Sequence, residues 1–139
     1  IKDLFKTSNG KYIAPQMIES LLLVDKYIDQ IAIIADQRKF VSALIIPEYR
    51  LLEEYARQKG IPFESREDLC ANEQIHSMMW ERIETLQQQL AHYEQVKRFT
   101  LIAHHFSMEN GELTNTLKLK RRVINENYKE EIEKMYEES

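Results

Sequence analysis

The chain has 139 residues, 43% of them hydrophobic and 30% charged, with only three glycines and three prolines. This composition fits one globular domain with a single core and excludes a mainly disordered or collagen-like chain. The formal net charge of −4 argues against a general nucleic-acid-binding protein, and the apolar runs are too short to cross a bilayer or to form a signal peptide.

The first predicted elements are a β-hairpin and a helix. An Asn-Gly pair lies between the extended segments Leu4–Lys6 and Tyr12–Ile13, which is a strong hairpin signal. Pro15 suits the first turn of a helix, and apolar residues keep a helical spacing from there to about Asp25.

Two strands and a second helix follow. Ile28–Ala35 and Phe40–Pro47 are rich in Ile, Val, Leu and Ala and are separated by four polar residues, which predicts consecutive antiparallel core strands. Tyr49–Lys59 has helical periodicity, and Gly60 is a typical residue for ending such a helix.

The second half predicts a short helical turn after Ser65, a long helix from Asn72 to about His92 and a third strand at Phe99–Ala103. Residues 113–119 are expected to be extended, and 121–138 to form a charged helix, with a break in it as an open alternative. Together these elements predict an α+β domain over residues 1–139. It would contain a β-hairpin and a mostly antiparallel three-stranded sheet flanked by helices.

The residue content favours no metal or disulfide chemistry. Cys70 is the sole cysteine, so an internal disulfide is excluded, and a cytoplasmic location is the default expectation. We interpret Cys70 as a half-buried side chain rather than a nucleophile. The four histidines show no zinc-site spacing, and the adjacent His104 and His105 would point to opposite faces of a strand end. We therefore expect no metal site.

Two segments place Lys, Thr and Gly too irregularly for plain core: Lys2–Pro15, followed by Ile18 and Glu19, and Asn110–Arg121. They resemble the two signature motifs in the carboxy-terminal domain of the adenylate-forming enzymes, a superfamily of acyl-CoA synthetases, luciferases and peptide-synthetase adenylation domains. The resemblance is close to the long-chain fatty-acyl-CoA synthetase branch, whose motifs read like KDLxKTSxGKYIxPxxIE and GELTPTLKxKR. Leu90–Phe99 also resembles that branch, so the likeness covers nearly the whole chain.

The resemblance implies a mobile lid. In this superfamily a large amino-terminal domain binds ATP, Mg²⁺ and the fatty acid, and the small domain rotates about a hinge between two steps. First the fatty carboxylate attacks the α-phosphate of ATP, giving acyl-adenylate and pyrophosphate, and then the CoA thiol displaces AMP. The family's hinge position corresponds to Lys2, beside Asp3.

The resemblance also implies partners. The lid would work with its own amino-terminal adenylation domain, which would bind most of the fatty acid, ATP, Mg²⁺ and CoA, so no ligand is expected to bind tightly to this chain alone. The chain begins at Ile1 without an initiator methionine, so we expect it to be a catalytically inactive fragment. A peripheral membrane association of the full-length enzyme is compatible with this interpretation, whereas nucleic-acid binding is not expected.

The resemblance selects Lys118 as the lysine of the adenylation step. A lysine on an ordered loop brings a point charge to carboxylate and phosphate oxygens as negative charge accumulates. If the segment is extended, alternation puts Lys118 and Lys120 on one side. The branch usually has proline where this chain has Asn115, which either loosens the loop or replaces the proline by its own turn-forming side chain.

The hairpin is assigned to the thioester step. There, backbone amides and small side chains would let a CoA nucleotide approach closely, at the residues Ser8, Asn9, Gly10 and Lys11. Two alternatives stay open. The chain is also compatible with the lid of an acyl-AMP or acyl-carrier-protein ligase. From a different class, a non-catalytic interaction module would dock residues 111–124, with four basic side chains and one acidic, on an acidic partner.

Overall fold

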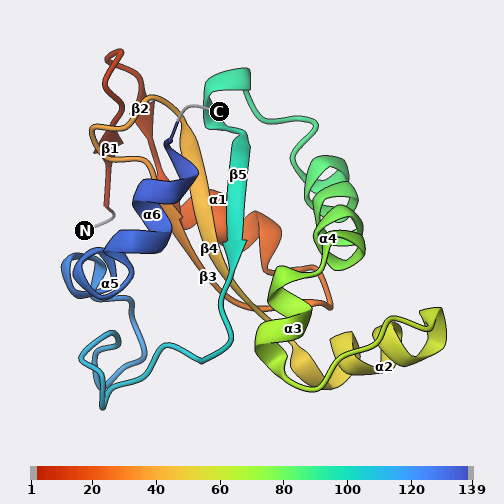
Figure 1. The fold of residues 1–139 in the computed structure, drawn as a ribbon. Helices are drawn as coiled ribbons and strands as arrows, with labels where there is room; N and C mark the ends of the chain where they lie inside the picture. Colours follow the sequence, from red (N-terminus) through yellow and green to blue (C-terminus); the bar gives the residue numbers. More distant parts are fainter. Residues whose placement is uncertain (1–2, 138–139) are drawn as a thin grey trace.

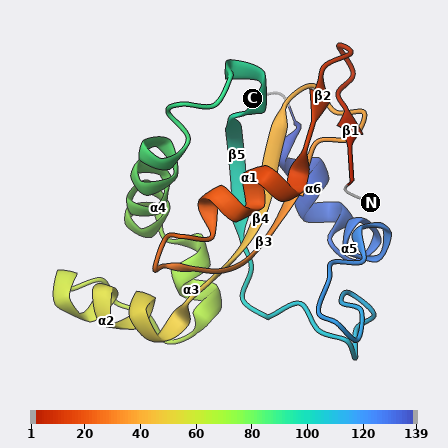
Figure 2. The ribbon, with the colours of Figure 1, turned by 180° about the vertical axis from the view of Figure 1, so that it is seen from behind.

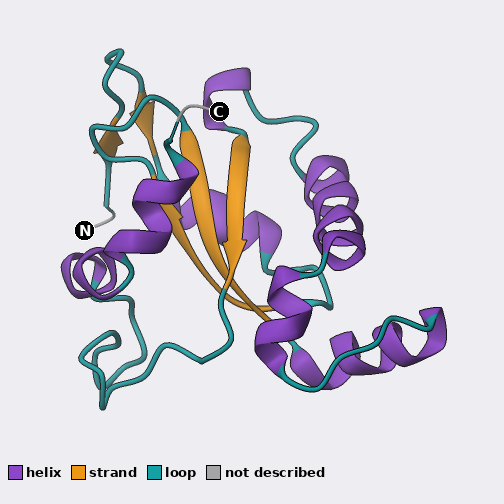
Figure 3. Cartoon of the chain, in the orientation of Figure 1, coloured by secondary structure: helices purple, strands orange, loops and turns teal. Residues whose placement is uncertain are grey.

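A computed structural model describes residues 3–137, in which helices cover both faces of a three-stranded sheet (Figures 1 and 3). The strands are β3 (Ile28–Ile34), β4 (Val41–Pro47) and β5 (Val96–Leu101), and they lie side by side in the order β3-β4-β5. All residues of the central strand β4 are buried. A strand that is buried on both faces needs apolar residues on both faces, which explains why every residue of β4 except Ser42 is apolar.

The sheet is mixed, so the prediction of a mostly antiparallel sheet is wrong in this respect. β3 and β4 are antiparallel as predicted, but β5 runs parallel to β4. The cause is the long connection between them, which contains the helices α2 (Tyr49–Lys59), α3 (Arg66–Ala71) and α4 (Glu73–Leu86). A connection of this length returns the chain to the end of the sheet at which β4 began, as in any parallel crossover. The α+β class is confirmed.

The remaining helices lie on opposite faces of the sheet. α1, Pro15–Leu22, covers one face and packs against β3 (Figure 2). α6, Lys129–Met135, lies over the other face against β5, with α5, Arg121–Asn127, beside it (Figure 1). The predicted terminal helix is therefore broken, at Tyr128, as the open alternative allowed. Each face of the sheet is thus covered by helices from a different part of the sequence.

The long helix predicted to reach His92 instead ends at Leu86, because the next residue turns inward. The Gln87 side chain is buried, and its Oε1 accepts a hydrogen bond from the Val96 amide at 2.7 Å while its Nε2 donates to the Val96 carbonyl at 3.0 Å. A single 3₁₀ turn, His92–Glu94, then leads into β5, which begins three residues before the predicted Phe99. Gln87 thus substitutes for a neighbouring strand at the start of β5.

Several local signals are confirmed. A short hairpin pairs β1, Phe5–Lys6, with β2, Tyr12–Ile13. Ser65 caps α3 by accepting a hydrogen bond from the backbone of the third helical residue, and Gly60 ends α2 with a φ of 70°. No helix within residues 3–137 is long and apolar enough to cross a membrane.

Candidate functional site

The hairpin of the first motif is closed by Thr7. Its hydroxyl accepts a hydrogen bond from the Lys11 amide at 3.1 Å, and its carbonyl accepts one from the Gly10 amide at 2.9 Å. Gly10 has a φ of 85°, a conformation that glycine adopts without steric cost. The Ser8 amide donates to the carbonyl of Arg38, which fixes the hairpin to the turn between β3 and β4.

The structure leaves few backbone amides of this hairpin available for the nucleotide contacts that the resemblance implies. Ser8, Asn9, Gly10 and Lys11 are all exposed, as a binding site requires. Three of their four amides already have partners within the chain, which leaves the Asn9 amide among the described residues. A ligand would thus meet mainly side chains here. Near the tip of the hairpin, the Lys11 ammonium lies 5.3 Å from the centroid of the Tyr93 ring.

The loop of the second motif reverses direction instead of being extended, so that prediction is wrong. Leu113 and Leu119 form an isolated antiparallel bridge. Between them the Thr114 amide donates to the Lys118 carbonyl at 2.8 Å, and the Thr114 hydroxyl accepts from the Lys118 amide at 3.0 Å. The Leu117 amide also donates to the Thr114 carbonyl, and Leu117 has a φ of 63°. A threonine that bonds to the residue four positions later closes the turn, which alternation alone does not reveal.

The reversal separates the two lysines that alternation would have placed together. Lys118 lines a groove of about 480 Å³ to which Lys120 does not contribute. Its charged residues come from both motifs and from β3: Asp3, Glu19, Asp29, Lys118 and Arg121. Its apolar residues are Leu23, Ile31, Leu113, Leu117 and Leu119. The groove therefore combines an exposed cation with apolar surface and buried charges.

Arg121 joins the two motifs in this groove. Its Nη1 and Nη2 donate to the carboxylate of Glu19 at 2.8 and 2.9 Å, and its Nε donates to Asp3 at 2.7 Å. Glu19 is only 7% exposed and also accepts a hydrogen bond from the Ile33 amide at 2.8 Å. Burial would lower the pKa of Arg121, but the hydrogen bonds and charges of Glu19 and Asp3 outweigh it and raise the pKa. The guanidinium therefore stays charged and ties α1, β3 and the second motif together.

Sequence reasoning assigned no role to Glu19 or Arg121. Each is the last residue of its motif, and that coincidence is the signal that would have paired them. Asp3, predicted as a neighbour of the hinge, is held by Arg121. Lys2, the predicted hinge itself, lies outside the described residues, so its role stays a prediction.

The base of the second motif is held by another buried acid. The Glu112 carboxylate accepts hydrogen bonds from the Ser107 amide at 3.1 Å and from the Asn127 side chain at 3.0 Å. It lies near Tyr128, whose pKa is raised to about 12, mainly by burial and then by the Glu112 charge. The loop that carries Lys118 is thus anchored at both ends.

The two predicted sites lie far apart. The hairpin and the loop of residues 110–120 are at opposite ends of the molecule, at the top and the bottom of both views (Figures 1 and 2). The separation holds when the domain is turned by 180° about the vertical axis. One orientation of the domain therefore cannot present both to the same point.

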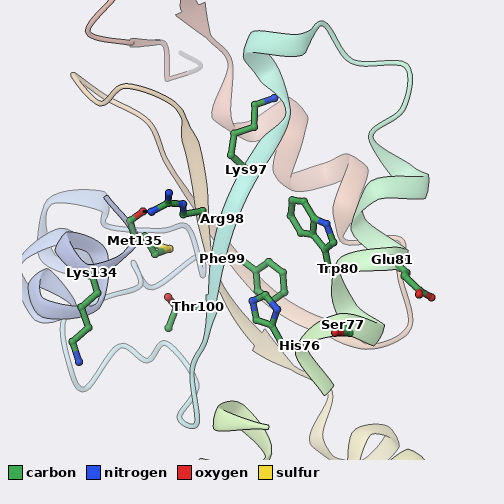
Figure 4. Close-up of a pocket in the computed structure, with 10 residues that line it drawn as sticks. All are labelled: His76, Ser77, Trp80, Glu81, Lys97, Arg98, Phe99, Thr100, Lys134 and Met135. Atoms are coloured by element: carbon green, nitrogen blue, oxygen red, sulfur yellow. Dashed lines mark hydrogen bonds between the residues drawn. The ribbon is translucent and has the colours of Figure 1, made fainter. Parts of the chain in front are cut away.

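A second hollow contains none of the predicted site residues. It has a volume of about 610 Å³ and lies along β5, where His76 and Trp80 of α4 stack on Phe99 with ring centroids 4.2 and 5.9 Å apart (Figure 4). On the side of α6 its Arg98 already donates to the carbonyls of Met135 and residue 137. These rings pack α4 against the edge strand β5.

The remaining candidates behave as side chains of the fold. Burial raises the pKa of the Cys70 thiol, whose sulfur lies 2.9 Å from the Tyr49 hydroxyl, so Cys70 is a half-buried thiol as predicted. His104 lies 3.5 Å from Glu67, and His105 lies 2.6 Å from Asp29. Across residues 3–137 there is no group of three side chains suited to hold a metal ion.

Comparisons with known proteins identify the relatives of this chain. Residues 2–139 match the family described as the AMP-binding enzyme C-terminal domain. Human long-chain-fatty-acid–CoA ligase 6 is 33% identical over 138 residues, which are 97% of this chain and 20% of that protein. Long chain acyl-CoA synthetase 6 of Arabidopsis thaliana, a peroxisomal protein, is 32% identical over 140 residues, again 20% of its length.

Solved structures show the same fold. The adenylation domain of a carboxylate reductase from Mycobacterium chelonae superposes with a TM-score of 0.77 at 21% identity, over 96% of this chain and 19% of that chain. The A-PCP didomain of carboxylic acid reductase from Segniliparus rugosus gives 0.76 at 22% identity, over 97% and 17%. This chain spans about a fifth of the length of the curated relatives it matches. With both motifs in place and nearly every residue covered, the chain belongs to the family of AMP-binding enzyme C-terminal domains.

Proposed function

We propose that this chain is the rotating lid of an AMP-forming long-chain fatty-acid–CoA ligase. The observation that carries the proposal is the placement of the Lys118 loop and the hairpin at opposite ends of one domain. Two sites so arranged serve one reaction centre in turn if the domain rotates between steps. The names of the relatives, which are long-chain-fatty-acid–CoA ligases, support the substrate class.

In the first step, Lys118 promotes adenylation of the fatty acid. An oxygen of the fatty carboxylate attacks the α-phosphorus of ATP, the bond to the β-phosphate oxygen breaks, and pyrophosphate leaves. The Lys118 ammonium is exposed at the groove and supplies a positive charge where negative charge accumulates. Its backbone is held on both sides by Thr114, so little reorganisation is needed. The absent large domain would hold most of ATP and Mg²⁺.

In the second step, the hairpin faces the CoA nucleotide. The thiol loses its proton to solvent, its sulfur attacks the acyl carbonyl carbon, the bond to the phosphate oxygen of AMP breaks, and AMP leaves with the pair of electrons. The exposed side chains of Ser8, Asn9 and Lys11 are the groups that would meet the anionic nucleotide. A carrier-protein thiol in place of CoA would use the same chemistry.

The test compares Lys118→Ala with Lys120→Ala in the full-length enzyme. Lys118→Ala should slow adenylation, measured by pyrophosphate exchange, by on the order of 10²-fold or more, because a charge aimed at the transition state is lost. Thioester formation from supplied acyl-adenylate should stay within about tenfold with CoA as acceptor, a margin of one log unit of rate. Lys120 is the matched control, a neighbouring exposed lysine outside the groove. Equal slowing by both variants would show a diffuse charge effect and contradict the proposal.

A further inference from the structure

Leu117 combines a strained backbone with an exposed apolar side chain. Its φ of 63° lies in the left-handed region, which within residues 3–137 only one other non-glycine residue, Gln37, adopts. A branched, bulky side chain disfavours this region relative to glycine. The side chain is also 66% exposed, whereas the loop's other leucines, Leu113 and Leu119, are partly buried. Backbone strain of this kind persists where the surrounding structure enforces it, and it clusters at functional sites.

The turn itself does not require a leucine. It is closed by three hydrogen bonds between Thr114 and the backbone of residues 117 and 118, and none involves the Leu117 side chain. Glycine would adopt the same φ without steric cost, and asparagine tolerates it well. The exposed side chain gains little burial within this chain to offset the strain. The benefit of a leucine must therefore come from something the chain meets.

The position of Leu117 indicates what it meets. It precedes Lys118 directly, and both line the same groove, to which Leu23, 42% exposed, adds further apolar surface. The chain spans about a fifth of its curated relatives, so a large part of a ligase lies outside it. That part must come within reach of Lys118 whenever the lysine acts on ATP.

We propose that Leu117 is a positioning residue for Lys118. In the adenylation orientation its side chain inserts into an apolar surface of the large amino-terminal domain, and this contact sets the approach of the lysine. The inference rests on the proposed function. The turn fixes Leu117 and Lys118 relative to each other. Insertion of the Leu117 side chain therefore sets the direction of the Lys118 side chain. Burying most of a leucine side chain favours the closed orientation by about tenfold.

Three substitutions in the full-length enzyme separate this role from a structural one: Leu117→Gly, Leu117→Asn and Leu117→Met. We expect Gly and Asn to lower the kcat of pyrophosphate exchange about tenfold, while thioester formation from supplied acyl-adenylate stays within about twofold. Met should keep adenylation within about threefold, since it restores apolar volume. A role in the turn alone predicts the reverse, because Gly and Asn adopt the left-handed conformation more easily than Leu or Met.

Stability and a matched control complete the experiment. The midpoint of thermal unfolding should be unchanged or higher for Gly and Asn, because strain is relieved. Val24→Ala removes a side chain that is 69% exposed and outside the groove, and it should leave both half-reactions unchanged. If Gly and Asn keep full adenylation, or if they lower the unfolding midpoint, the inference is wrong. If Lys118→Ala is also without effect, the proposed function fails as well, and if Lys118→Ala alone slows adenylation, only the role of Leu117 is lost.

Discussion

Glu19→Gln tests the contact that joins the two motifs. In the structure the Glu19 carboxylate accepts hydrogen bonds from both terminal nitrogens of Arg121 and from the backbone amide of Ile33. Glutamine keeps an oxygen that accepts from the Ile33 amide and from Nη1 of Arg121, but its NH₂ group then faces Nη2 and cannot accept from it. Arg121 would then be left buried with only Asp3, whose side chain is half exposed, to balance its charge.

The expected loss follows from this geometry. Removing one partner of a buried ion pair costs about 3–5 kcal/mol, because the other charge stays buried without compensation. The retained bond to Ile33 and the contact of Arg121 with Asp3 reduce this loss, so the free energy of unfolding should fall by about 2–3 kcal/mol. For a chain of this size, 1 kcal/mol shifts the Tm by roughly 3–5 °C, so the Tm should fall by about 10 °C.

The assay is thermal and urea unfolding of the 139-residue chain, followed by circular dichroism. Glu133→Gln is the matched control, since Glu133 pairs with Arg38 at the surface, with side chains 50% and 29% exposed. An exposed pair contributes about 0–1 kcal/mol, so this variant should barely change the Tm. If the two variants lose the same small amount, the contact between Glu19 and Arg121 does not stabilise the fold and the reasoning fails.

Three further predictions concern the hinge, the end of α4 and Tyr128. Lys2→Pro in the full-length enzyme should fix one orientation of the lid, so that one half-reaction falls far more than the other, and equal loss would contradict the hinge assignment. Gln87→Leu leaves the buried amide and carbonyl of Val96 without partners and should cost about 2–4 kcal/mol in urea unfolding, whereas a loss below 1 kcal/mol would mean that water replaces the side chain. The folded-state pKa of Tyr128 is raised to about 12 by burial and the Glu112 charge. The stability contributed by the neutral Tyr128 side chain should therefore be complete below about pH 10, the unfolded pKa, and lost as the pH rises through 12. Spectrophotometric titration should show this tyrosine ionising at a higher pH than a free tyrosine. Disappearance of the late-ionising group in Tyr128→Phe would confirm the assignment.

Local signals in the sequence determined most of the elements. The Asn-Gly pair predicted the hairpin, Pro15 the start of α1, and Gly60 the end of α2, and the structure confirms each. These signals are reliable because a residue's own steric limits, such as the fixed φ of proline or the freedom of glycine, act within a few residues. The family was also readable from sequence, because both motifs are contiguous segments.

Contacts between distant segments were decided only by the tertiary structure. Gln87 has a good helix-forming side chain, yet it ends α4 because it pairs with Val96, nine residues away. The parallel direction of β5 depends on how three intervening helices pack, and the bond between Glu19 and Arg121 joins positions 102 residues apart. The left-handed backbone of Leu117 is equally invisible to periodicity, which reports side-chain polarity and not backbone angles. Packing overrides local preference at such positions because the buried hydrogen bonds and charges there are satisfied only by partners that the fold brings together.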